Sequence, residues 1–163
     1  MQTILYNSGY QYQLAEAYEL QLAPLLAPLL PAPLAVPVET DWIQIGVSGE
    51  LWIKKGYAWN GPSGPTFDTP DFMRGSLVHD ALYQLMRLAL LDATIYREPA
   101  DQVLLAICLQ DGMPAFRANY VYQGVRLFAA SSALVGEDRK VWLAPRPVTQ
   151  LVINAVEIQV IGG

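Results

Sequence analysis

The chain has 163 residues, of which 53% are hydrophobic and only 15% charged, and its formal net charge is −5. This length suits one folded domain, and the apolar composition excludes an intrinsically disordered charged chain. No Lys or Arg precedes Lys54, so we expect no broad binding to nucleic-acid phosphates.

The N-terminal half is predicted to be extended. Residues 10–22 alternate loosely between apolar and polar side chains, which is typical of a strand. Two apolar runs, at residues 42–47 and 51–53, are joined by the Gly46–Glu50 segment and predict a β-hairpin. Residues 56–70 are rich in Gly and Pro and predict a rigid, ordered loop.

Residues 20–38 lie between these strands and carry no charge over 19 positions, close to the length that crosses a bilayer. Five prolines interrupt the segment, and each removes a backbone donor that lipid cannot replace. We therefore expect no membrane span. The segment is either a Pro-rich apolar connector or an arm that docks on another chain.

Helical periodicity begins after the loop. Thr69-Pro70-Asp71 combines a capping residue, Pro in the first turn and an acidic residue, so it predicts a helix from there to about Leu91. A second helix is expected to start near Glu98-Pro99 and to stop at Asp111-Gly112. A third follows Pro114 and ends by Gly136, and its predicted core residues are Tyr120, Val121, Gly124, Val125 and Phe128.

The alternating, β-branched residues 151–161 predict a final strand. The fold class expected is α+β, with N-terminal β-strands and a hairpin, a three-helix core and a C-terminal β-strand. We expect a single domain over residues 1–163. Within it lie the connector or arm at 20–38, a core at 40–136 and a C-terminal strand or arm at 147–163.

Chemistry-bearing residues are concentrated around the first two predicted helices. His79 and Asp80 are adjacent, so about 100° separates them around a helix, with His79 at the edge of the apolar face. Asp101 is expected in the first turn of the second helix, where the helix dipole favours an acid. Arg97, four residues earlier, could pair with it.

Four ordered segments carry a family resemblance: residues 56–65, 77–83, 97–101 and 122–128. Together they resemble small phage and prophage proteins of a conserved domain family of unknown function. That family has a Gly-aromatic-x-x-Asp-Gly-x-Ser-x-Pro loop, a His-Asp-x-Leu-Tyr helix and an Arg-x-x-Ala-Asp helix. The match covers roughly residues 50–130. The resemblance implies a phage origin and a shared site that consists of Asn60, Ser63, His79, Asp80 and Asp101. At position 60 this chain has Asn where the family has an acid.

Three interpretations of this site remain open, and we favour the first. In a buried polar network, His79 and Asp80 would bond to the Gly- and Pro-rich loop and cap the helix that carries Asp101, because buried polar groups must be paired. His79, Asp80 and Asp101 could instead bind Mg²⁺, Mn²⁺ or a catalytic Zn²⁺, or act without metal. A Ser63-His79-Asp101 triad is disfavoured, because Ser63 lies between Pro62 and Gly64 rather than on a nucleophile elbow.

Cys108 is the only cysteine and His79 the only histidine, which excludes an internal disulfide and a structural Cys/His zinc site. Cys108 is predicted to be an inert core thiol. The N-terminus lacks the features of a signal peptide, so we expect synthesis in a host cytoplasm.

Two functions are inferred as hypotheses. The first is a virion-associated structural or interaction protein of a tailed bacteriophage, in the tail or baseplate, whose partners are other virion proteins or copies of itself. The alternative is a metal-dependent hydrolase acting on an amide or cell-wall substrate through His79, Asp80 and Asp101. No cofactor is predicted, apart from a divalent metal ion if the site is catalytic.

Overall fold

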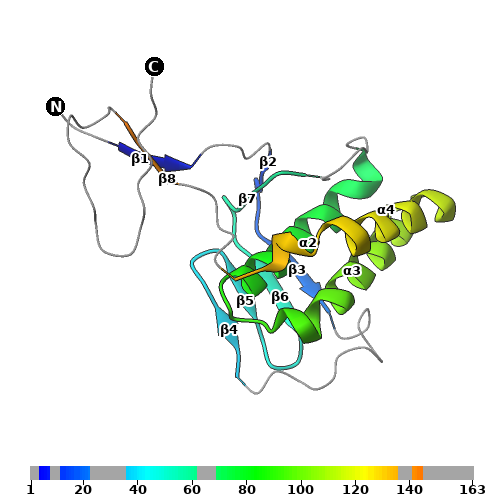
Figure 1. Ribbon diagram of the computed structural model, residues 1–163, viewed down its shortest axis with the longest axis horizontal. Coiled ribbons are helices and arrows are strands. Elements are labelled where there is room, and N and C mark those ends of the chain that lie inside the picture. Colours follow the sequence, from blue (N-terminus) through cyan, green and yellow to red (C-terminus); the bar gives the residue numbers. More distant parts are fainter. Residues whose placement is uncertain (1–3, 8–11, 23–35, 62–68, 136–140, 145–163) are drawn as a thin grey trace. The chain divides into compact units, whose positions relative to one another are not determined.

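The computed structural model describes residues 4–7, 12–22, 36–61, 69–135 and 141–144 (Figure 1). The chain forms two compact units, of which one contains residues 1–9 and 138–163 and the other contains residues 10–137. In the group formed by the ends, β1 (Ile4–Asn7) pairs antiparallel with β8 (Val141–Ala144). The larger unit, residues 10–137, contains the remaining described elements and all of the candidate site residues.

A four-stranded antiparallel sheet forms one layer of the larger unit, in the order β3-β6-β5-β4. Its strands are β3 (Tyr18–Gln21), β4 (Val38–Glu39), β5 (Ile43–Ile45) and β6 (Glu50–Ile53). The predicted hairpin is confirmed, since β5 and β6 pair antiparallel across the turn between them. A separate two-stranded pair joins β2 (Tyr12–Gln13) to β7 (Ala58–Trp59).

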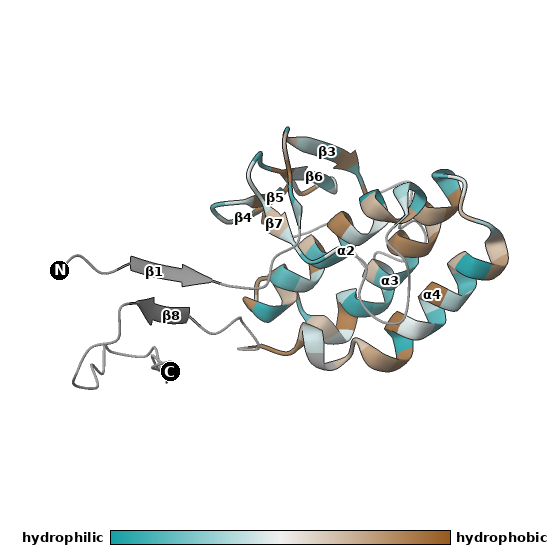
Figure 2. Cartoon of the chain, turned by 90° about the horizontal axis from the view of Figure 1, so that it is seen from above, coloured by the Kyte–Doolittle hydropathy of each residue, from teal (hydrophilic) through white to brown (hydrophobic). Residues whose placement is uncertain are grey.

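The sheet buries one face and exposes the other, as strand alternation requires. In β6, Leu51 and Ile53 are buried, whereas Trp52 between them is exposed. The buried face packs in one hydrophobic core with Val78 and Leu85 of the first helix. Figure 2 shows the sheet on one side of this helix.

The three predicted helices are present, which with the N-terminal strands confirms the α+β class: α2 (Pro70–Arg87), α3 (Ala93–Gln110) and α4 (Ala115–Phe128). A short 3₁₀ turn, η1 (Ser131–Ala133), comes after α4. Helix α2 begins at the predicted Thr69-Pro70 signal. It ends before the predicted Leu91, because the chain turns at Ala89, which has a φ of 57°.

Helix α3 begins five residues earlier than its predicted start near Glu98-Pro99. Asp92 caps it, accepting a hydrogen bond from the Thr94 N–H at 2.8 Å. Pro99 therefore lies inside the helix and removes one intrahelical donor there. As a consequence, Asp101 sits near the middle of α3 rather than in its first turn.

Helix α4 buries a narrower face than the sequence predicted. Ala118 and Val121 are buried against α3, in a cluster that includes Leu104. Tyr120 and Phe128, both expected in the core, are 62% and 82% exposed. The apolar pattern correctly predicted a helix, but the other described residues cover only one side of it.

Both ends of the predicted arm at 20–38 belong to the sheet. Leu20 pairs with Leu51 within the β3–β6 ladder, and Val38 begins β4. Residues 23–35, and the predicted strand at 151–161, lie outside the described residues. Within the ranges that the structure describes, no helix combines the length and apolar character needed to cross a membrane.

A buried polar network at the candidate functional site

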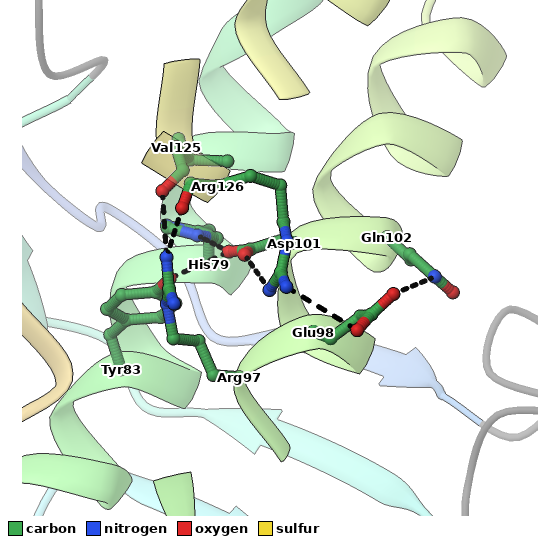
Figure 3. Close-up of polar contacts among 8 residues, drawn as sticks. All are labelled: His79, Tyr83, Arg97, Glu98, Asp101, Gln102, Val125 and Arg126. Carbon is green, nitrogen blue, oxygen red and sulfur yellow. Dashed lines mark hydrogen bonds and ion pairs between the residues drawn. The ribbon is translucent and has the colours of Figure 1, made fainter. Parts of the chain in front are cut away.

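Asp101 is the centre of the candidate site and is fully buried. Its Oδ1 accepts a hydrogen bond from the Tyr83 hydroxyl at 2.7 Å and lies 2.8 Å from His79 Nε2. Its Oδ2 accepts a bond from Arg126 Nη1 at 3.1 Å. Figure 3 shows these three side chains converging on one carboxylate from α2 and α4.

The Asp101 carboxylate is held in its ionised form. Burial alone would raise the pKa of Asp101, but hydrogen bonds from His79, Tyr83 and Arg126 outweigh it and lower the pKa below its ordinary value. An ionised carboxylate only accepts hydrogen bonds. The imidazole of His79 must therefore donate from Nε2, which makes Nδ1 the nitrogen able to accept a proton.

Helix α2 supplies two neighbouring donors because His79 and Tyr83 are four residues apart and share a helix face. Their rings stack at a tilt, with centroids 4.1 Å apart and planes 33° apart. Burial, with the hydrogen bond to Asp101, raises the pKa of the Tyr83 hydroxyl. Tyr83 therefore stays protonated and remains a donor throughout the physiological range.

A second pair of contacts extends the network to the end of α4. Arg97 Nη2 donates to the backbone carbonyls of Val125 and Arg126 at 3.3 and 2.6 Å. The last carbonyls of a helix lack intrahelical donors and carry partial negative charge, so they favour a cation. Arg97 Nε also reaches the Tyr83 hydroxyl at 3.3 Å. The network thus fastens α2, α3 and α4 to one another.

Arg97 was expected to pair with Asp101, and this expectation is wrong. The partner of Asp101 is Arg126, which also contacts the exposed Glu98 at 3.4 Å. Sequence reasoning missed Arg126 because it belongs to a different helix, 25 residues away. The signal for Tyr83 was present, since it lies one helical turn beyond His79.

The predicted site residues are only partly brought together. His79 and Asp101 are in direct contact, whereas Asp80 is partly exposed, about 100° further round α2. Asn60 follows β7, and its Oδ1 is the one buried side-chain polar atom without a hydrogen-bond partner among the described residues. Ser63 lies outside the described residues.

The strand before Asn60 is fixed directly to α2. Trp59 Nε1 donates to Ser76 Oγ at 3.2 Å, and the Ser76 hydroxyl donates to the Met73 carbonyl at 2.9 Å. Asn60 is therefore anchored near the helix that carries His79. Cys108 is fully buried in a hydrophobic cluster, and burial raises the pKa of its thiol to about 12. A thiol in that state is a poor nucleophile.

Metal binding gains no support from the arrangement. In the part of the chain that the structure describes, no group of three or more His, Cys, Asp or Glu side chains is placed to hold a metal ion. Binding by His79, Asp80 and Asp101 therefore stays a prediction. The contacts of Asp101 instead come from an imidazole, a hydroxyl and a guanidinium.

Comparison with known proteins leaves the site to be interpreted from its geometry. No protein-family model matches the chain, and neither a curated protein nor a solved structure matches it. The resemblance to phage and prophage proteins stays a prediction. What the geometry offers is a buried polar link between three helices.

Proposed function

We propose that this protein is a structural, protein-binding subunit of a tailed-phage particle, in the tail or baseplate. One observation carries the proposal: large apolar side chains are exposed on the described surface, while both oxygens of the buried Asp101 carboxylate accept hydrogen bonds from within the chain. Phe116 and Phe128 are more than 80% exposed, and Trp42 and Trp52 are 45% and 43% exposed. Exposed aromatic side chains in number are characteristic of protein-binding surfaces.

The buried network is better suited to holding helices than to acting on a substrate. A catalytic group must come within hydrogen-bond distance of a reacting atom. The Asp101 carboxylate is fully buried, and both of its oxygens already accept hydrogen bonds. Satisfied networks of this kind fix one arrangement of the core, which is what a subunit of an ordered assembly requires.

The outer face of the sheet offers one docking surface. Trp52 stands at its centre, with Glu19 of β3 and Gln44 of β5 directly opposite on the neighbouring strands. A tryptophan flanked by polar residues is a common arrangement at binding hot spots, because the ring adds much apolar area and a hydrogen-bond donor.

The proposal is tested by mass spectrometry of purified particles of the phage that encodes the chain. We expect the protein at a fixed copy number per particle, and Trp52→Ser to reduce its incorporation without lowering its melting temperature. Gln44→Ser, on the same face, is the matched control and should be incorporated normally. Complete absence from particles that are otherwise intact would refute the proposal.

The metal-dependent hydrolase remains a second candidate because of one observation. A carboxylate that holds His79 Nε2 orients the imidazole and makes Nδ1 available as a base or metal ligand, an arrangement found in many metal sites. The His79 side chain is 9% exposed. This candidate requires stoichiometric metal in the purified protein and hydrolysis of an amide or cell-wall substrate that His79→Gln abolishes.

A further inference from the structure

Helix α4 presents an apolar face that nothing in the described chain covers. Phe116, Tyr120, Leu127 and Phe128 are 81%, 62%, 71% and 82% exposed. At about 100° per residue they fall within an arc of roughly 120°, away from the buried Ala118. Figures 1 and 2 both show α4 beyond α3, away from the sheet.

Gly124 lies in the middle of this face, and no contact within the described chain requires a glycine there. A Cβ built on Gly124 would meet no atom within 4 Å. Gly75 in α2 differs, because its Cβ would come within 3.0 Å of both Cys108 and Leu104. A glycine inside a helix costs about 1 kcal/mol relative to alanine. Gly124 is therefore best explained by the close approach of a group that does not belong to the described residues.

We propose that α4 is a homodimer interface, in which the α4 helix of a second copy packs antiparallel across a two-fold axis. Phe116, Tyr120, Gly124 and Phe128 follow one another at four-residue intervals and form a single ridge. If the two-fold axis crosses the helices at the level of residue 122, Tyr120 faces Gly124 of the second copy, and Phe116 faces its Phe128. The large and the small residue thus complement each other, as a self-complementary two-fold interface requires.

The face is large enough for a dimer. A large aromatic side chain carries roughly 150–250 Å² of surface, so the three partly covered aromatic side chains together with Leu127 offer about 500–600 Å² per copy. Pairing two copies would bury at most roughly 1,000–1,200 Å² in total through these side chains, which lies at the lower end of the sizes of specific interfaces.

Charge also favours pairing of identical helices. Arg117 and Arg126 are the only charged residues of α4. Arg117 bonds to Asp71, and Arg126 bonds to Asp101 and Glu98. Since both guanidinium groups are neutralised within their own chain, two α4 helices can meet without like-charge repulsion.

This inference names the partner at one surface of the proposed structural subunit, and its test is independent of the phage. The full chain is compared with its variants by sedimentation equilibrium at tens of micromolar. We expect wild type at twice the 18.0 kDa monomer mass and Gly124→Leu at the monomer mass, with a native circular dichroism spectrum. Ala115→Leu is the matched control, because it adds the same side chain to an exposed position outside the face, and it should stay dimeric.

Monomeric wild type, or a Gly124→Leu variant that remains fully dimeric, would overturn the inference. If Gly124→Leu misfolds, Tyr120→Ser serves instead, since that side chain is 62% exposed and its loss leaves the monomer core intact. A monomer that is still incorporated into particles would reject the dimer and keep the proposed function. A protein that is dimeric in solution but absent from particles would keep the dimer and reject the proposed function.

Discussion

Replacing Asp101 by Asn tests the buried network with the smallest change of shape. The amide oxygen of Asn can still accept from His79 and Tyr83, but its NH₂ group then faces Arg126 Nη1, which now lies 3.1 Å from a carboxylate oxygen (Figure 3). A donor therefore meets a donor. The two remaining bonds also lose the charge of their acceptor.

The expected loss is about 2–3 kcal/mol. A hydrogen bond to a charged group contributes roughly 1.5–3 kcal/mol, and neutral bonds are about half as strong as charge-assisted ones. The loss stays below the roughly 3–5 kcal/mol of a fully broken buried pair. The reason is that the Arg126 side chain is 28% exposed and keeps Glu98 as a partner.

Urea unfolding at pH 7, followed by tryptophan fluorescence, measures this loss through the midpoint at constant slope. The melting temperature should fall by roughly 5–10 °C for a chain of this size. Glu98→Gln is the matched control, because it removes the other acid of the same arginine from a side chain that is 57% exposed. Surface pairs contribute about 0–1 kcal/mol, so equal losses in the two variants would refute the stabilising role of the network.

Three further predictions concern the core. The pKa of Asp101 is lower in the folded than in the unfolded chain, so its stabilisation is complete above its ordinary value of 3.8 and is lost as pH falls through the lower folded value. The stability difference between wild type and Asp101→Asn, measured by thermal melts from pH 7 to pH 2.5, should therefore shrink only below about pH 4, and a constant difference would contradict this. Gly75→Ala should cost up to about 2 kcal/mol in urea unfolding, because overpacking against Cys108 and Leu104 at 3.0 Å costs about 1–3 kcal/mol and the better helix propensity of alanine returns about 1 kcal/mol. A midpoint above that of wild type would show that the two helices accommodate the added methyl group without cost. Cys108 should resist a thiol reagent at pH 8 until the protein unfolds, because it is fully buried and burial raises its pKa to about 12, and rapid labelling of the native protein would disprove it.

Local signals predicted much of the fold. Pro70 marked the start of α2 because a first-turn proline acts within a few residues, although the side chain of Thr69 at the N-cap makes no capping hydrogen bond. The start of α3 was missed because Glu98-Pro99 imitates a helix start, although Asp92 followed by Thr94 was an available capping signal. Because a proline inside a helix is rare, Pro99 was interpreted as the start of the helix.

The sequence indicated which residues belong to the site, but not which of them bond to one another. The predicted network had His79 and Asp80 bonded to the loop at residues 56–70 and capping the helix of Asp101, whereas in the structure His79 contacts the Asp101 carboxylate directly. The rule for residues four apart assigned Arg97 to Asp101, but that rule describes an isolated helix. Once α3 packs on α4, Arg97 reaches the carbonyls at the end of α4, and Arg126 takes the carboxylate. Such choices depend on tertiary packing, which no short segment specifies.

Metal analysis of the purified wild-type protein separates a structural network from an active site. The protein is purified without chelator, and its divalent metals are quantified per chain by inductively coupled plasma mass spectrometry, beside His79→Ala and Asp101→Asn. If the network is structural, wild type carries well under one metal ion per chain, and both variants change only in stability. One metal ion per chain in wild type, lost in both variants, would contradict the structural role and make His79 and Asp101 part of an active site.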